Sequence, residues 1–108
     1  MSIIENFEKM LAAGQDSALL RYSLGTAYQK DGDLDQALQH LASAVQQDPA
    51  YSAAWKAYGK VLVEAGKPDD AIRAFEQGIA VAGEKGDIQA AKEMQVFLKR
   101  ARKAATGD

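Results

Sequence analysis

The sequence predicts an all-α fold in which about six helices pack as antiparallel pairs into a solenoid. Apolar residues recur at helical spacing in each of six segments, and no segment alternates apolar and polar residues as a strand would. The gaps between the segments are only a few residues long, which favours antiparallel neighbours. A shift of 34 residues brings the chain onto itself, and a period of that length is typical of stacked helix pairs.

The composition is that of one globular domain, spanning residues 1–108. Apolar residues make up 47% and charged residues 26% of the chain, so neither disorder nor a membrane span is indicated. The net charge of −2 gives no general attraction to nucleic acid. The chain has no cysteine. Its first residues do not resemble a signal peptide, because Glu5 and Glu8 break the apolar run that such a peptide needs. We therefore expect a cytoplasmic protein with neither nucleic-acid nor membrane partners.

Start and stop signals mark the first three helices. Ser2 followed by Glu5 forms a capping box, Gly32 ends the second helix, and Asp33 with Gln36 opens the third. Each of these helices carries one apolar stripe, and Pro49 ends the third helix. The first stripe is Ile3, Ile4, Phe7, Met10 and Leu11; the second is Leu20, Leu24, Ala27 and Tyr28; the third is Leu34, Ala37, Leu38, Leu41, Ala44 and Val45.

The last three helices are marked by start and stop signals of the same kind. The fourth ends at Gly66, and the fifth begins at Pro68, because proline suits the first position of a helix. A final helix follows Gly83 and Gly86, and its register relative to the repeat stays open. We expect burial of the stripes Ala54, Trp55, Tyr58, Val61 and Leu62; Ala71, Ile72, Phe75 and Ile79; and Ile88, Ala91, Met94, Leu98 and Ala101.

The 34-residue shift keeps the physical type of each matched residue. It superposes Leu24-Gly25 on Tyr58-Gly59, Tyr28 on Leu62, Gly32 on Gly66, Ala37 on Ala71, Leu41 on Phe75 and Val45 on Ile79. Gly25 and Gly59 lie inside helices, where glycine costs about 1 kcal/mol relative to alanine. We expect them to allow a close approach of the paired helices, at Ala37 and Ala71.

These residues resemble the tetratricopeptide repeat family, whose pattern runs Trp, Leu-Gly, Tyr, Ala, Phe and Pro at fixed offsets. Arg21 replaces the tryptophan in the first repeat, and Gly83 replaces the proline in the second. The resemblance implies a right-handed solenoid with an N-terminal flanking helix at 1–14, repeats at 18–51 and 52–85, and a C-terminal capping helix at 86–106.

The sequence offers little for catalysis. His40 is the one histidine, and we expect it to be exposed on the convex side of the solenoid. Asp31, Asp33 and Asp35 flank a glycine, but the later glutamate of a calcium loop is missing, so these acids fit a turn and a helix start. We expect no enzyme, no cofactor and no metal site.

The family resemblance implies a concave groove that binds an extended peptide or a helix of a partner. The groove positions carried over to this chain are Leu19, Tyr22, Thr26, Gln29 and Lys30 in the first repeat and Ala53, Lys56, Lys60, Val63 and Glu64 in the second. Lys56 and Lys60 share one helix face and, with Tyr22 opposite, could contact an acidic peptide or a C-terminal carboxylate. The alternative is a solvated helix face.

Some family members bind chaperone tails through a clamp of lysine, asparagine and arginine. Tyr22, Thr26 and Lys60 stand at places of this clamp, so most of it is absent and chaperone-tail binding is not indicated. Lys99, Arg100, Arg102 and Lys103 crowd the end of the last helix, where they complement the helix dipole or form a phosphate- or membrane-binding patch.

The function predicted is therefore a non-catalytic adaptor that binds a protein or peptide. The alternative is a structural, self-associating homodimeric module, and the expected state is a monomer or a weak homodimer.

Overall fold

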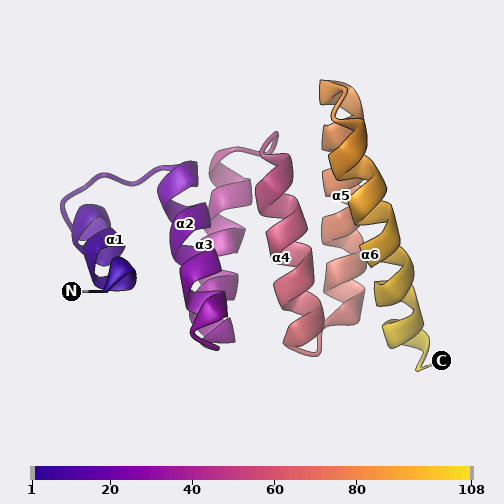
Figure 1. Cartoon of the computed structure of the whole chain (residues 1–108), viewed down its shortest axis with the longest axis horizontal. Coiled ribbons are helices and arrows are strands. Elements are labelled where there is room, and N and C mark those ends of the chain that lie inside the picture. The colour runs from indigo at the N-terminus through magenta and orange to yellow at the C-terminus, as the bar shows by residue number, and fades with distance from the viewer. Residues whose placement is uncertain (1, 108) are drawn as a thin grey trace.

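The computed structural model describes residues 2–107; Met1 and Asp108, the ends of the predicted domain, lie outside the described residues. Within this range the chain forms six helices and no strand: α1 (Ile3–Ala12), α2 (Ala18–Lys30), α3 (Leu34–Gln47), α4 (Ser52–Glu64), α5 (Pro68–Lys85) and α6 (Ile88–Thr106). Figure 1 shows that the helices follow one another along the long axis, with the two termini at opposite ends. The all-α solenoid with six helices is confirmed.

The predicted start and stop signals lie at the helix ends. The Ser2 side chain accepts a hydrogen bond from the backbone N–H of Glu5, and the Asp33 side chain accepts one from that of Gln36. The turn after α2 contains Gly32 with φ +81°, a left-handed conformation that side chains rarely adopt. Gly83, in contrast, does not end α5, which continues to Lys85.

The core runs through the helix pairs α2–α3, α4–α5 and α5–α6, which pack closely, and α3 joins the two repeats by packing against α4. The largest fully buried side chains are Leu24, Leu41, Val61, Phe75 and Met94. They come from five helices, α2 to α6, so each of these helices contributes to the core.

Gly25 and Gly59, the helical glycines at matched repeat positions, make room for large side chains rather than for alanines. A Cβ atom at Gly25 would lie 2.5 Å from Cγ of Leu41, and one at Gly59 would lie 2.5 Å from Cε1 of Phe75. The prediction of a close approach is right, but Ala37 contributes only its backbone oxygen, 3.3 Å from the Gly25 position, and Ala71 is not among the nearest neighbours of Gly59.

Several predictions of exposure are wrong. Four residues expected to be buried pack against the core but are only half-buried: Tyr58, Ile72, Ile79 and Ala91. His40 is buried, with 5% of its surface exposed, because Arg21, Tyr28 and Glu8 surround it. Trp55 is only half-buried, since its indole N–H reaches outward to donate to the carbonyl oxygen of Pro49 at 2.8 Å. Ile88 is 67% exposed, because it opens α6 before that helix packs against its neighbours.

A candidate binding groove

Most of the predicted groove residues line one hollow between α2 and α4. This hollow has a volume of about 330 Å³. Its lining residues are Tyr22, Thr26, Gln29 and Lys30 from α2, and Ala53, Lys56, Ala57 and Lys60 from α4. The structure thus brings the two helix faces assigned from the sequence together, with three lysines around one depression.

The remaining predicted residues lie beside this hollow. Leu19 is 64% exposed and lines a separate depression with Phe7 and Met10 of α1. Val63 and Glu64 line a pocket of about 220 Å³ between α4 and α6. Lys60 lines this pocket as well as the α2–α4 hollow, so the two adjoin.

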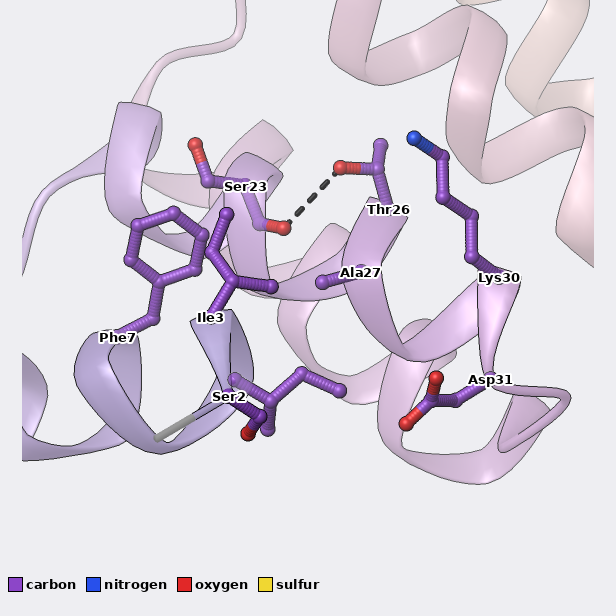
Figure 2. A pocket seen from close by; sticks show the side chains of 9 residues that line it. Ser2, Ile3, Phe7, Ser23, Thr26, Ala27, Lys30 and Asp31 are labelled. Atoms are coloured by element: carbon purple, nitrogen blue, oxygen red, sulfur yellow. Dashed lines mark hydrogen bonds between the residues drawn. The ribbon is translucent and has the colours of Figure 1, made fainter.

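A third hollow, of about 370 Å³, lies between α1 and α2 (Figure 2). Ile3, Ile4 and Phe7 of α1 form its apolar side, and Thr26 and Lys30 lie on its α2 side. Thr26 and Lys30 also line the α2–α4 hollow. The α1–α2 hollow, the α2–α4 hollow and the α4–α6 pocket therefore form one continuous surface, which we call the groove. Thr26 and Lys30 join the first two, and Lys60 joins the last two.

Polar contacts fix several groove side chains. The Gln29 side chain donates a hydrogen bond to Oε1 of Glu64 at 2.6 Å, which ties α2 to α4. The Thr26 hydroxyl donates to the carbonyl oxygen of Ser23 at 3.1 Å, within its own helix (Figure 2). The Thr26 hydroxyl is thus bonded within its own helix, and one oxygen of the Glu64 carboxylate is engaged by a neutral amide.

The two lysines singled out from the sequence have different surroundings. Nζ of Lys56 forms an ion pair with Oε1 of Glu93 on α6, at 3.2 Å. Nζ of Lys60 lies 5.1 Å from the centre of the Phe97 ring, and the guanidinium of Arg100 lies 5.7 Å from the same ring. Lys56 is therefore partly neutralised, and Lys60 keeps its charge available to a ligand.

Sequence reasoning missed the contribution of α6, namely Glu93, Phe97 and Arg100. The register of this helix was open because α5 runs past Gly83 and breaks the 34-residue phase. One signal was present: Phe97 follows the apolar Met94 by three residues and Arg100 follows Phe97 by three, which makes Phe97 a neighbour of each on the helix surface.

His40 lies outside the groove, in a polar cluster at the junction of α1, α2 and α3. Nδ1 of His40 is 3.2 Å from Nη1 of Arg21, and Nε2 is 3.8 Å from Oε1 of Glu8. The ring stacks on Tyr28 with the centroids 5.6 Å apart. Burial lowers the pKa of His40, which favours the neutral ring.

Arg21 links this cluster to the segment between α1 and α2. Nε of Arg21 lies 2.8 Å from Oδ1 of Asp16, and this hydrogen bond holds the pKa of Asp16 well below its usual range. The Gln47 side chain also donates to Asp16, at 3.0 Å. Arg21, at the place where the repeat pattern has tryptophan, thus serves as a polar anchor for the chain before α2.

Two further kinds of site, metal-ion clusters and membrane-spanning helices, were sought among the described residues. Within residues 2–107, no group of three or more histidine, cysteine or acidic side chains is arranged to hold a metal ion. No helix in the same range has both the length and the apolar character needed to cross a membrane.

Paired helices, a 34-residue repeat and an open groove along one side define an α-solenoid of the helix-pair class. A model of the tetratricopeptide repeat matches residues 28–94, which is more than half of the chain. The chain belongs to the tetratricopeptide repeat family.

Relatives support the family and the fold over nearly the whole length. The chain is 51% identical over 104 residues to TPR repeat-containing protein PA0015 of Pseudomonas aeruginosa, covering 96% of this chain and 99% of that one. The solution structure of protein BPP2914 from Bordetella parapertussis superposes with a TM-score of 0.81 at 46% identity, covering 95% of this chain and 90% of that one. A tetratricopeptide repeat domain protein from Salinibacter ruber superposes with a TM-score of 0.75 at 30% identity, covering 81% of this chain and 97% of that one.

Tetratricopeptide repeat proteins bind protein partners and are generally non-catalytic. The fold therefore indicates a protein-interaction module.

Proposed function

We propose that this protein is a non-catalytic adaptor that binds a segment of a partner protein in the groove. The observation that carries this proposal is the continuity of the groove from α1 to α6, in which the hollows share Thr26, Lys30 and Lys60. A surface that crosses four helices can contact many residues of an extended segment or a helix, as repeat arrays commonly do.

The charges of the groove favour an acidic partner segment or one with a free C-terminal carboxylate. Among the residues that the structure describes, no carboxylate lies within ion-pair distance of Nζ of Lys30 or Lys60. The chain as a whole carries a net charge of −2, so the attraction is local to the groove. Local charge of this kind steers and orients a partner more than it raises affinity.

Affinity capture with charge-reversal variants tests the proposal. Lys60→Glu reverses a charge in the groove, and Arg73→Glu makes the same change in a hollow that shares no lining residue with the groove. Both side chains are exposed, so neither change is expected to unfold the protein. We expect at least one protein to be retained by the wild type and by Arg73→Glu but lost by Lys60→Glu. A partner lost only by Arg73→Glu would place binding in the hollow that Arg73 lines, outside the groove.

Sedimentation equilibrium distinguishes the adaptor from the self-associating module. An adaptor is expected to stay monomeric as its concentration rises, and Lys60→Glu is expected to leave the mass unchanged. A dimer that Lys60→Glu dissociates would show that the groove binds a second copy of the chain.

A further inference from the structure

The outer face of α6 carries a continuous stripe of residues at helical spacing. Its members follow one another at intervals of three or four residues, and all of them are exposed: Ile88, Lys92, Val96, Lys99 and Lys103. The buried residues Met94, Leu98 and Ala101 each come two positions after a member of this set, which places them on the opposite side of the helix. We call the exposed set the α6 stripe.

The α6 stripe lies at one end of the solenoid. α6 is the last helix of the array, and among the described helices it comes close only to α5 and α4 (Figure 1). The groove uses other residues of α6, namely Phe97 and Arg100. Within residues 2–107, the hollows described above contain no member of the stripe. The stripe is therefore a surface of its own, and an inference about it goes beyond the proposed function.

Positive charge is concentrated on α6, although the chain as a whole is acidic. Residues 88–106 hold five of the 13 lysine and arginine residues but only one of the 15 acidic residues. That acid, Glu93, forms the ion pair with Lys56 at 3.2 Å. The three lysines of the stripe have no carboxylate within ion-pair distance among the residues that the structure describes. Their charge is therefore available to a ligand.

The helix dipole accounts for only one of these three lysines. Cations are favoured near the C-terminus of a helix, and the effect fades beyond the last turn. Of the stripe lysines, only Lys103 lies in the last turn of α6. Lys92 and Lys99 lie closer to the start of the helix, where the dipole does not stabilise them. Their alignment with Lys103 on one face therefore indicates a ligand.

The residue types in the stripe do not suit a protein or a nucleic acid. Lysine is depleted at the centre of protein–protein interfaces, yet here it forms the centre of the face. Single-stranded nucleic acids stack their bases on aromatic or arginine side chains, and the stripe has neither. Ile88 and Val96, which are 67% and 52% exposed, would stay in water beside the phosphates of a duplex.

A lipid surface accounts for both the lysines and the aliphatic residues. A lysine can lay its apolar stem along apolar surroundings while its ammonium group stays among the headgroups. Aliphatic side chains on the same helix face reach the boundary between headgroups and acyl chains. From Lys92 to Lys103 the stripe covers about 16 Å of helix axis, so it can contact several headgroups at once. The lysines require that the headgroups be anionic.

We propose that the α6 stripe binds the surface of an anionic membrane. The three lysines contact lipid phosphates, and Ile88 and Val96 reach the edge of the acyl region. This inference departs from the expectation of no membrane partner, which was based on the net charge of −2. Salt screens charges beyond about 10 Å, so the acids on remote helices oppose the binding only weakly.

Co-sedimentation with lipid vesicles tests the proposal. We expect the protein to bind vesicles of equal parts phosphatidylglycerol and phosphatidylcholine at about 0.1 M salt, and not to bind phosphatidylcholine alone. Binding is expected to be lost at about 1 M salt, where the Debye length falls to about 3 Å. No binding to the anionic vesicles, or equal binding to both kinds, would overturn the inference.

A lysine variant and its matched control test the stripe itself. Lys99→Gln removes one cation of the stripe, and Lys9→Gln makes the same exposed change on α1, at the opposite end of the solenoid (Figure 1). We expect Lys99→Gln to weaken binding to the anionic vesicles about fivefold, which corresponds to about 1 kcal/mol for one lysine near such a surface. Lys9→Gln is expected to change it little. Equal weakening by both variants would contradict a role for the stripe.

The aliphatic residues distinguish a membrane from another polyanion. Val96→Ser keeps the charge of the stripe and is expected to weaken vesicle binding about threefold, because an apolar contact is lost. Duplex DNA at the same concentration of phosphate is expected to bind less protein than the anionic vesicles do. An unchanged Val96→Ser, or DNA that binds as much protein as the vesicles, would overturn the assignment to a membrane.

A fluorescent label shows which surface meets the vesicle. The chain has no cysteine, so Val96→Cys can carry a single polarity-sensitive dye, and Met10→Cys carries the same dye on the exposed face of α1. We expect anionic vesicles to shift the emission of the dye at position 96 to shorter wavelength and to leave that at position 10 unchanged. A shift at position 10 alone, or equal shifts at both positions, would contradict the proposal.

Discussion

The two terminal helices flank the same solenoid but are held in different ways. α6 buries Met94, Leu98 and Ala101 and packs against both α5 and α4. α1 has no buried residue, and its backbone comes close only to α2 among the described helices. Its apolar residues Ile3 and Met10 are exposed. The comparison shows that α6 is part of the cooperative core, whereas α1 is a lightly attached cover at the other end of the groove.

Truncation of a side chain on each terminal helix gives the largest expected difference. Met94→Ala removes a fully buried side chain of α6 and is expected to cost about 2–5 kcal/mol of unfolding free energy. Met10→Ala removes an exposed side chain of α1 and is expected to cost less than about 1 kcal/mol. Urea denaturation followed by circular dichroism measures both. Equal losses would show that α1 is as well packed as α6.

Added methyl groups on α5 test how closely α6 approaches it. A Cβ atom at Gly78 would overlap Sδ of Met94 and lie 2.9 Å from Cβ of Trp55, whereas one at Gly83 would meet nothing within 4 Å. We expect Gly78→Ala to destabilise the protein by about 1–3 kcal/mol. Gly83→Ala is expected to stabilise it by up to about 1 kcal/mol, because alanine favours the helix. Thermal melts compare the two, and a neutral Gly78→Ala would contradict the close packing of α5 and α6.

Acidification tests the polar junction near α1. Burial lowers the pKa of His40, Arg21 acts in the same direction, and the carboxylates of Glu8 and Asp16 oppose it. The unfolded chain therefore binds a proton at higher pH than the folded chain does, so stability is full above the ordinary histidine pKa of about 6.5 and falls as the pH drops below it. Denaturation at pH 7 and pH 5 should show a smaller loss for His40→Gln than for the wild type. An equal loss in both would assign the pH dependence to other groups.

Amide hydrogen exchange gives the smallest and most local difference. Because α1 buries no residue, we expect its amides to exchange by local opening, on the order of tenfold or more faster than those around Met94 in α6. Mass spectrometry of peptides from residues 3–12 and 88–106 resolves the two helices. Equal protection would mean that α1 opens only with the whole fold.

The repeat made much of this fold predictable. Capping at Ser2 and Asp33, the stops at Gly32 and Gly66, and burial of Leu24, Leu41 and Phe75 all depend on local signals or on the 34-residue period. The sequence also assigned most of the α2 and α4 residues that line the central hollow, though not Ala57.

The errors in predicted burial arise where contacts between distant segments determine whether a side chain is exposed. His40 is polar and was expected in solvent, but Arg21, Tyr28 and Glu8, from two other helices, enclose it. Trp55 has the helical spacing of a core residue, yet periodicity does not reveal that its indole turns toward Pro49.

The part of the groove contributed by α6 could not be derived from the repeat. α5 extends past Gly83, so the 34-residue phase no longer determines which face of α6 meets α4. Burial of Met94, Leu98 and Ala101 and the packing of Phe97 on Phe75 fix that register. This register brings Arg100 beside Lys60 and Phe97. A contact between side chains 22 positions apart leaves no periodic trace in the chain.

Site-specific photo-crosslinking tests most directly whether partners bind in the groove. A benzoylphenylalanine residue placed at Thr26, at Lys60 or, as the control outside the groove, at Arg73 reports which surface touches a partner in cells. We predict the same crosslinked partner from positions 26 and 60 and none from position 73. Crosslinks from position 73 alone, or from none of the three, would contradict the account.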